Sequence, residues 1–187
     1  MKLKFYPIII FTFNRPKNLL KLIKSLKINK NFQKHEYYFF CDGPKNNSKC
    51  SDKNQIKKNL DVIKSLSVKK KIIVRKSNFG LSKNIIDGVT KVFKNHKACI
   101  ILEDDLILNN NCLEFINFGL NKFENNKDIG SISGYSYIHN FKKYKNIRWL
   151  RSYRHCSWSW GTWKNIWKKI DWNEAKKKYV IKNFNFY

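Results

Sequence analysis

The sequence predicts an α/β domain whose mainly parallel sheet is flanked by helices. Short apolar runs alternate along the first half of the chain with stretches of helical period, and the connections between them are short. This alternation favours right-handed crossovers and therefore parallel strands. A chain of 187 residues is long enough for one such domain and too short for two ordinary ones.

Four apolar runs have the length and composition of buried strands, and turn residues such as Asp42-Gly43 follow them. The predicted strands are Pro7–Phe13, Glu36–Cys41, Lys71–Arg75 and Ala98–Leu102. Helices with apolar residues at helical spacing connect them, and a proline suits the start of the first. The predicted helices are Pro16–Lys27, Ser51–Leu66 and Leu81–Lys94, with a further helix expected around Asn111–Lys122. In the third of these, Leu81, Ile85, Val89 and Val92 are expected to face the core.

The chain is strongly basic, with 39 Lys and Arg against 13 Asp and Glu and a formal net charge of +26. Such an excess is typical of proteins that meet nucleic acid, an anionic membrane or a phosphate-rich substrate. Most of these cations are scattered lysines, whereas a nucleic-acid reader usually concentrates arginine, which binds bases and phosphates bidentately. The codon bias of an AT-rich genome explains the lysines as well as selection for a polyanion does. We therefore expect no specific nucleic-acid ligand.

Five cysteines without C-x-x-C spacing argue against a zinc ribbon or a disulfide framework and favour a reducing, cytoplasmic setting. The apolar start of the chain lacks the small-residue cleavage site of a signal peptide. No apolar run reaches the length of a membrane span, so any contact with the inner face of the membrane is expected to be peripheral.

Polar residues follow each predicted strand, at the sheet edge where α/β proteins bind ligands. The most informative group is Glu103-Asp104-Asp105, because three adjacent carboxylates repel one another and a divalent cation relieves that repulsion. Hard oxygen ligands suit Mg²⁺ or Mn²⁺, which often bind one or two carboxylates together with substrate phosphates. The alternative is a solvated acidic turn before the next helix.

These strand-end motifs occur in an order that resembles the GT-A glycosyltransferases of the broad family 2 type. The likeness extends over about residues 6–172 and looks closest to bacterial sugar transferases akin to the enzyme that adds N-acetylglucosamine to start complex N-glycan branches. It includes the segments 129–134 and 157–167, the second of which is rich in tryptophan. The strand-end motifs are Thr12-Phe-Asn-Arg-Pro16, Asp42-Gly43, Asn78-x-Gly80-Leu-x-x-Asn84 and Glu103-Asp-Asp-Leu106.

The resemblance implies a GT-A-type, Rossmann-like fold and a role for each matching residue. Asp105 would coordinate the metal that bridges the donor diphosphate, while Glu103 and Asp104 would hold the ribose and the metal-bound waters. Asp42 would accept the imide N–H of a uracil-like base, and its alternative is a plain Asp-Gly turn. The remaining donor-side residues, for which a solvated surface is the alternative at the cations, are Thr12, Asn14, Arg15, Asn78 and Lys83.

The tryptophan-rich segment is expected to shape the acceptor side, through Trp160 and Gly161. Aromatic faces suit the C–H faces of sugars, and a glycine allows the backbone to approach a ligand. The alternative is that these tryptophans are core residues. The single domain would thus consist of a nucleotide-sugar-binding part, residues 1–134, and an acceptor-side part, residues 135–187.

The implied reaction is metal-dependent transfer of a sugar, with inversion, from a nucleotide diphosphate donor to a hydroxyl of a glycan or lipid-linked acceptor, as in cell-surface polysaccharide synthesis. The general base stays unassigned, because Asp171 and Glu174 come too early to match the family motif. The sequence therefore also allows a truncated, non-catalytic nucleotide-sugar-binding module. A basic nucleic-acid-binding protein is a third alternative. The Gly-rich loop of a nucleotidyltransferase or a dinucleotide dehydrogenase is missing after the first strand.

Overall fold

The computed structural model describes residues 3–136 and 149–173. Its centre is a six-stranded sheet in the order β3-β2-β1-β4-β6-β5. The first four of these strands are parallel to one another, whereas β6 runs antiparallel to both of its neighbours. The strands are β1 Ile8–Thr12, β2 Tyr37–Cys41, β3 Lys70–Val74, β4 Ala98–Glu103, β5 Ile132–Ser133 and β6 Trp160–Trp163.

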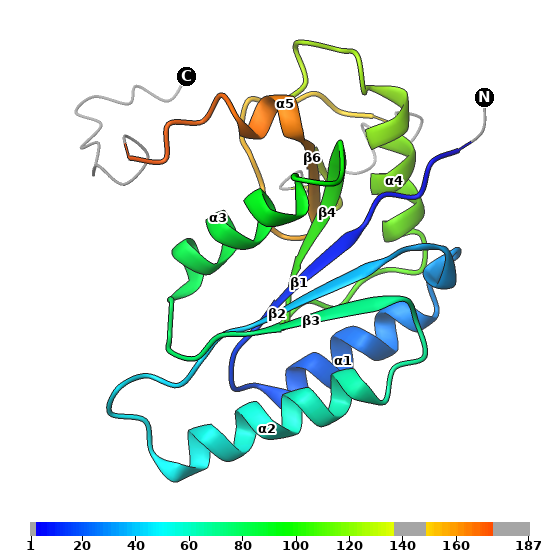
Figure 1. The fold of residues 1–187 in the computed structure, drawn as a ribbon. Coiled ribbons are helices and arrows are strands. Elements are labelled where there is room, and N and C mark those ends of the chain that lie inside the picture. Colours follow the sequence, from blue (N-terminus) through cyan, green and yellow to red (C-terminus); the bar gives the residue numbers. More distant parts are fainter. Residues whose placement is uncertain (1–2, 137–148, 174–187) are drawn as a thin grey trace, which may run out of the picture.

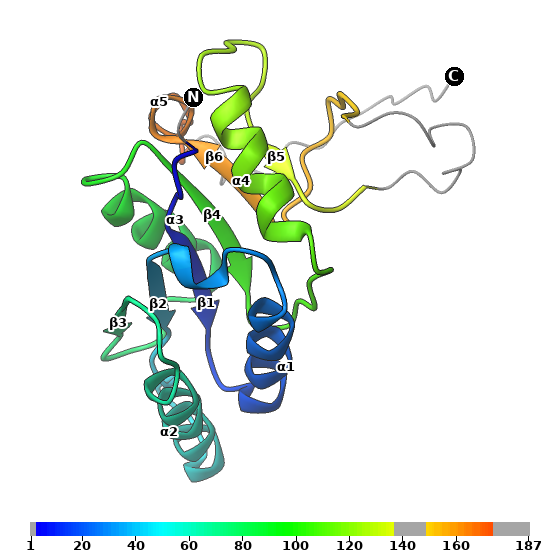
Figure 2. The same cartoon turned by 90° about the vertical axis from the view of Figure 1, so that its right-hand side faces the viewer.

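Helices cover both faces of this sheet and give the molecule three layers (Figures 1 and 2). One face packs against the first, second and fourth helices, and the other packs against the third and fifth. The helices are α1 Pro16–Lys27, the 3₁₀ helix η1 Phe32–Lys34, α2 Cys50–Lys64, α3 Leu81–Val92, α4 Cys112–Lys122 and α5 Lys164–Trp167. The predicted α/β class and mainly parallel sheet are confirmed.

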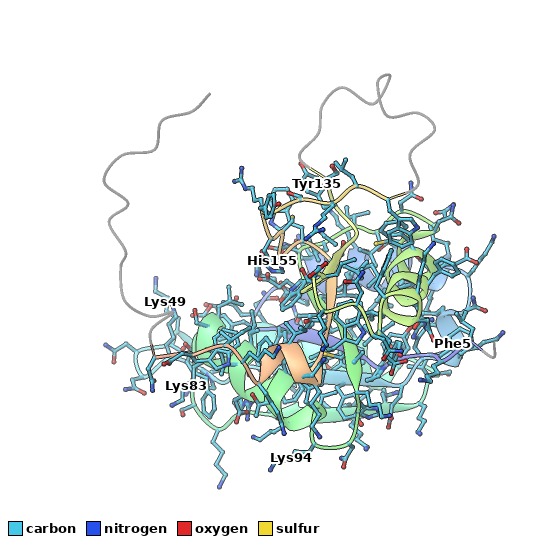
Figure 3. The ribbon with its side chains drawn as sticks, turned by 90° about the horizontal axis from the view of Figure 1, so that it is seen from above. Phe5, Lys49, Lys83, Lys94, Tyr135 and His155 are labelled. Atoms are coloured by element: carbon cyan, nitrogen blue, oxygen red, sulfur yellow. The ribbon has the colours of Figure 1, made fainter. Side chains whose placement is uncertain are left out.

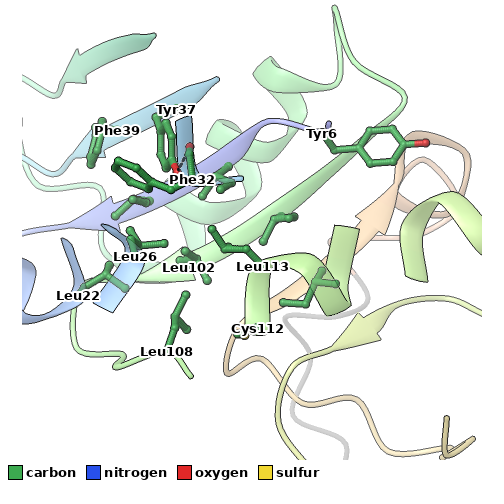
Figure 4. Close-up of a cluster of buried hydrophobic side chains, with 14 of the residues drawn as sticks. Tyr6, Leu22, Leu26, Phe32, Tyr37, Phe39, Leu102, Leu108, Cys112 and Leu113 are labelled. Atoms are coloured by element: carbon green, nitrogen blue, oxygen red, sulfur yellow. Dashed lines mark hydrogen bonds between the residues drawn. The ribbon is translucent and has the colours of Figure 1, made fainter. Parts of the chain in front are cut away.

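Strands β1 and β2 are buried along their whole length, as their unbroken apolar sequences predict. Alternate residues of β1 enter the two cores: Ile8 and Ile10 lie on one face, and Ile9 and Phe11 on the other. Figure 4 shows part of the first core, where side chains from α1, β2, β4 and α4 meet. Burial on both faces fixes the register of the sheet, because a slip of one residue would exchange the two faces.

The chain changes direction across the sheet between β1 and β4. The crossovers through α1 and α2 build the sheet outward to β3, and α3 then returns the chain along the opposite face to place β4 beside β1. Such a reversal of strand order opens a crevice at the carboxyl ends of the two strands. These ends lie toward the lower left of Figure 1.

The structure corrects one detail of the predicted helix faces. Leu81 was expected to face the core of the third helix, yet it is exposed and stands as the first residue of α3, after Gly80 with its positive φ of 73°. Val89 and Val92 of the same helix are buried as predicted. Leu81 therefore faces solvent at the start of α3 and does not contribute to the core.

Candidate functional site

The switch point between β1 and β4 brings together two of the predicted motifs. Phe11 pairs with Glu103 across the two strands, and the Asp104 amide donates to the Phe11 carbonyl at 3.1 Å. The Phe13 amide donates in return to Oδ2 of Asp104 at 3.2 Å. The turn that carries Thr12, Asn14 and Arg15 is thereby fixed against the acidic triplet.

The Arg15 guanidinium connects the last two carboxylates of this triplet. One of its terminal nitrogens lies 2.9 Å from Oδ1 of Asp104, and the other donates a hydrogen bond to Oδ2 of Asp105 at 3.0 Å. Asp104 is 1% exposed, whereas the side chain of Asp105 is 43% exposed. Asp104 is therefore part of the framework, and Asp105 is the carboxylate that an incoming ligand can reach.

The carboxyls of the triplet are not equivalent electrostatically. Burial raises the pKa of Glu103, and the charges of Asp105 and Asp104 raise it further against the opposing effect of Arg15. Burial also raises the pKa of Asp104, although a hydrogen bond from Thr12 and the charge of Arg15 act against that rise. Burial thus opposes the charged form of both carboxyls, and a cation close to them would favour that charged form.

A divalent cation fits the chemistry of this donor set. Oδ1 of Asp104 is buried and accepts no hydrogen bond of good geometry from the described residues, although Arg15 lies near it as an ion pair. Within the described residues no three His, Cys, Asp or Glu side chains converge as a complete metal cage. Sites for Mg²⁺ and related ions need only one or two carboxylates when substrate phosphates supply further oxygens. Asp105, with Asp104 beside it, meets that requirement.

Helix α2 supplies two polar side chains that the sequence did not identify. Asn59, fully buried, donates to Oγ1 of Thr12 and to the Phe13 carbonyl, both at 2.8 Å. Asp52 accepts a hydrogen bond from the Asn14 amide at 3.0 Å. Asn59 could have been identified from the sequence, because it lies on the apolar face of the predicted helix and a buried amide requires hydrogen-bond partners. Thr12 and Asn14 are thus oriented by α2.

Asp42 lies at the end of β2, where its carboxylate holds the loop before α3. Oδ1 accepts the amides of Gly43 at 2.9 Å and Phe79 at 2.8 Å. Oδ2 accepts the Asn78 side-chain amide at 3.1 Å and the Gly80 amide at 3.0 Å. Both oxygens are therefore fully used within the protein, and the Asn78 amide also donates to the Gly43 carbonyl at 3.0 Å. Whether Asp42 reads a base stays a prediction.

Arg75, which follows β3, supports the same loop from the other side. Its side chain is buried, and it forms a hydrogen bond to Asn84 and an ion pair with Asp87, both on α3. The guanidinium also lies over the rings of Phe40 and Phe79, at 5.3 Å and 4.5 Å from their centroids. The sequence placed Arg75 only as the last residue of a strand, because its partners are far away along the chain.

Lys83 lies on the first turn of α3, away from the packed interior. Its ammonium stands 4.7 Å from the Phe79 ring centroid, and it lines a hollow of about 750 Å³ beside Trp172. No carboxylate of the acidic triplet lines this hollow. In the view from above, Lys83 and Lys49 lie on the opposite side of the molecule from Phe5, which precedes β1 (Figure 3). Lys83 therefore belongs to the carboxyl-end side of the sheet.

The tryptophan-rich segment forms β6, and much of it is core. A side chain at Gly161 would come within 2.8 Å of Leu120 and 3.0 Å of Ile116. Trp163 is buried and donates to the Leu120 carbonyl at 3.1 Å. Gly161 thus meets a packing requirement of α4, and its predicted role toward an acceptor stays untested.

Other aromatic side chains of this region are partly or about half exposed. Trp160 is partly buried, with the ring of His155 edge-on at 4.6 Å. Trp158 and Tyr135 are about half exposed and pack edge to face at 4.8 Å. Figure 3 shows Tyr135 and His155 on the same side of the molecule. Trp160 was predicted for the acceptor side, and that role stays a prediction; Trp158 and Tyr135 add exposed aromatic faces of the kind that suits a sugar.

The structure assigns the role of general base to neither Asp171 nor Glu174. Asp171 is exposed and accepts the Asn173 amide at 2.8 Å. Glu174 lies outside the described residues.

Among the helices of the described ranges, none combines the length and the apolar character needed to cross a membrane.

Comparison with known proteins supports a family for this chain. The family described as Glycosyl transferase family 2 matches residues 8–182. A search of curated proteins found no significant match.

Solved structures with a similar backbone include two of S. aureus TarS. Residues 1–349 of that protein match with a TM-score of 0.48 and 16% identity, covering 65% of this chain and 33% of the other. A structure titled S. aureus TarS matches with a TM-score of 0.47 and 15% identity, covering 65% and 20%. The chain thus spans a third or less of the length of these structures.

Proposed function

The chain belongs to glycosyl transferase family 2, and from that premise we propose that it transfers a sugar from a uridine diphosphate donor to an acceptor hydroxyl. The mainly parallel sheet with its β1/β4 switch point is that of a GT-A-type α/β domain. The observation that carries the proposal is the pairing of Arg15 with Asp104 and Asp105 at this switch point. The site thus offers both a cation and a carboxylate to a metal-bound diphosphate.

The donor diphosphate binds in the crevice at the carboxyl ends of β1 and β4. Arg15, at the start of α1, supplies a guanidinium that can bind phosphate oxygens bidentately. The first-turn amides of α1 add the partial positive charge of a helix N-terminus. The overall charge of +26 attracts a nucleotide diphosphate over a longer distance.

Mn²⁺ or Mg²⁺ is the proposed cofactor, held by Asp105 with support from Asp104 and Glu103. When bound, such a cation stabilises the negative charge that develops on the leaving diphosphate. The acceptor hydroxyl gives its proton to a general base, which is not assigned to a residue, and attacks the anomeric carbon. The bond from that carbon to the diphosphate breaks, the nucleoside diphosphate leaves, and the configuration inverts. Asp104 contributes by fixing the β1–α1 turn, so that Arg15 and Asp105 face the same phosphate groups.

The base and ribose occupy the space bounded by the ends of β1 and β2. Thr12 and Asn14 are held there by α2, while Asp42 orients the loop of Asn78 and Gly80. Because the oxygens of Asp42 are already used, reading of a uracil imide by Asp42 requires one loop hydrogen bond to be exchanged. Lys83 follows this loop and is proposed to approach a phosphate when the loop closes.

The acceptor side is proposed to begin at residue 135. The exposed pair of Trp158 and Tyr135, with Trp160 close to Trp158 in the sequence, offers aromatic faces to a glycan or a lipid-linked sugar. A role in cell-surface polysaccharide synthesis at the cytoplasmic face of the membrane follows from such an acceptor. The finer relationship to bacterial relatives of the N-glycan branching N-acetylglucosaminyltransferase belongs to the same proposal.

Calorimetry with uridine diphosphate, with and without Mn²⁺, tests the donor half of this function. We expect binding that requires Mn²⁺ and that is weaker for adenosine and guanosine diphosphates. Equal binding of all three nucleotides without Mn²⁺ would refute the donor assignment. Binding of duplex DNA that falls steeply with salt and ignores Mn²⁺ would favour the nucleic-acid alternative. Donor binding without any consumption of donor would favour a non-catalytic module.

A further inference from the structure

Arg15 occupies the space between two carboxylates at which a divalent cation is expected to bind. Its two terminal nitrogens lie 2.9 Å from Asp104 and 3.0 Å from Asp105, so one guanidinium satisfies both acids. A guanidinium and a divalent cation compete for the space between these two carboxylates, because their like charges repel each other at that distance. The free protein therefore has its own cation at this position.

The surrounding framework leaves only the side chains of Arg15 and Asp105 free to respond. The Arg15 carbonyl accepts the Leu19 amide of α1 at 3.0 Å, which fixes the backbone at the start of the helix. Asp104 is held by the Phe13 amide and is buried. The side chains of Arg15 and Asp105 are 48% and 43% exposed, so their ion pair can open into solvent at small cost. The pair of Arg15 with the buried Asp104 is costlier to break, and a bound cation has to replace it.

We propose that Arg15 is an internal counter-cation that must leave the carboxylates when Mn²⁺ or Mg²⁺ binds, and that it then moves to the donor diphosphate. This inference rests on the proposed function, since it assumes that the cation and the nucleotide meet at Asp105. It adds a competition to that function. Arg15 weakens cation binding in the free protein and becomes a phosphate ligand only when the cation has displaced it.

The competition makes cation and nucleotide binding cooperative. Without nucleotide, the cation must separate Arg15 from two carboxylates and leave it without a partner. With nucleotide, the released guanidinium gains phosphate oxygens, so the separation is compensated. Linkage requires that each ligand raises the affinity for the other by the same factor. Arg15 thus favours loading of the complete metal–donor pair over loading of either ligand alone.

Titration of the free protein with Mn²⁺, followed by electron paramagnetic resonance, tests the competition without nucleotide or acceptor. Arg15→Met removes the charge and keeps much of the apolar stem, and we expect it to bind Mn²⁺ on the order of tenfold more tightly than the unaltered chain. Lys17→Met is the matched control, because it removes an exposed cation from the first turn of the same helix. It should leave Mn²⁺ affinity within about twofold.

Two further variants keep the test decisive. Arg15→Lys keeps one charge but cannot reach both carboxylates with a planar fork, so its Mn²⁺ affinity should be intermediate. Adding Asp105→Asn to Arg15→Met should remove the gain. Equal or weaker Mn²⁺ binding by a folded Arg15→Met chain would overturn the competition while leaving the metal site intact. No Mn²⁺ binding by any variant, with or without uridine diphosphate, would instead overturn the metal-dependent function itself.

The coupling is measured separately with uridine diphosphate. In the unaltered chain Mn²⁺ should raise nucleotide affinity strongly. In Arg15→Met that factor should be smaller, since only the direct contact between the cation and the diphosphate remains to couple the two ligands. An undiminished factor in Arg15→Met would show that Arg15 does not transfer to the diphosphate.

Discussion

Asp42 accepts the backbone amide of Gly80 at 3.0 Å, which ties the end of β2 to the residue before α3. Gly80 has a positive φ of 73°, a conformation that favours glycine, so the loop turns sharply at this contact. The same carboxylate holds Gly43, Asn78 and Phe79. One buried acid therefore shapes the loop that is proposed to cover the nucleotide.

Asp42→Asn is expected to disturb this loop. Every carboxylate oxygen accepts two donors, so the new amide nitrogen must face two N–H groups that it cannot accept. We expect the free energy of unfolding to fall by about 1.5–3 kcal/mol and uridine diphosphate to bind more weakly, with less preference over other bases. Urea denaturation and calorimetry measure both effects. Asp128→Asn, at an exposed position, is the control, and equal behaviour of the two variants would contradict the loop role.

Asp105→Ala and Asp104→Ala should separate the ligand-binding carboxylate from the structural one. Asp105 is nearly half exposed, so its loss should change the free energy of unfolding by under about 0.5 kcal/mol yet remove Mn²⁺-dependent nucleotide binding. Asp104 is buried and accepts the Phe13 amide, so its loss should destabilise the fold by about 1–3 kcal/mol. Thermal unfolding and calorimetry distinguish them. Unchanged nucleotide affinity in Asp105→Ala would remove the triplet from the site.

Arg75→Met is expected to loosen α3 and the Phe79 loop together. Arg75 is buried and joins Asn84, Asp87 and the Phe79 ring, whereas Lys91 pairs with Asp87 from the surface. We expect a loss of about 1–3 kcal/mol for Arg75→Met, since Asp87 keeps one partner, and under about 1 kcal/mol for Lys91→Met. If Arg75 positions the loop, Arg75→Met should also weaken uridine diphosphate binding. Similar values for both variants in denaturation and in calorimetry would refute this.

Gly161→Ala tests whether the absence of a side chain at this position serves packing or the acceptor. The added methyl would meet Leu120 at 2.8 Å and the Cys99 carbonyl at 3.1 Å, and the latter is backbone and cannot rotate away. Overpacking of this kind costs about 1–3 kcal/mol. Denaturation should therefore show a loss of stability with nucleotide affinity unchanged. Gly130→Ala, where the nearest atom is 3.9 Å away, is the control.

The first four strands and their helices were predictable from local pattern, because apolar runs and helical periods report burial directly. The acidic triplet was predictable as well, since its place after a central strand determines where it lies. Strand β6 was not, because its residues Trp160–Trp163 pair with β4 through contacts distant in sequence. The structural roles of Arg75 and Asn59 could not be predicted for the same reason. Their partners, Asp87 and Thr12, are identified only by the fold.

A last prediction concerns how stability depends on pH through His35, a buried histidine that precedes β2 at the amino-terminal end of the sheet. His35 is 2% exposed, and its Nδ1 lies 2.7 Å from the Tyr6 carbonyl, so that nitrogen carries the proton in the neutral ring. Burial lowers the pKa of His35 below the ordinary 6.5, and the hydrogen bond to Tyr6 only partly offsets this. Below pH 6.5 the unfolded chain therefore binds a proton that the folded chain excludes.

The free energy of unfolding should thus decrease as the pH falls from 7.5 through 6.5, by at most about 1.4 kcal/mol per pH unit for this one group. His35→Asn keeps an N–H donor near the Tyr6 carbonyl but cannot titrate. The variant should be less stable at pH 7.5, because it loses the edge contact with the Phe5 ring, and its stability should depend less on pH. The variant keeps the acidic triplet and the other histidines, whose titrations therefore cancel when urea-denaturation curves of the two proteins are subtracted between pH 7.5 and 5.5. A difference that does not change with pH would show that His35 titrates alike in the folded and unfolded chain.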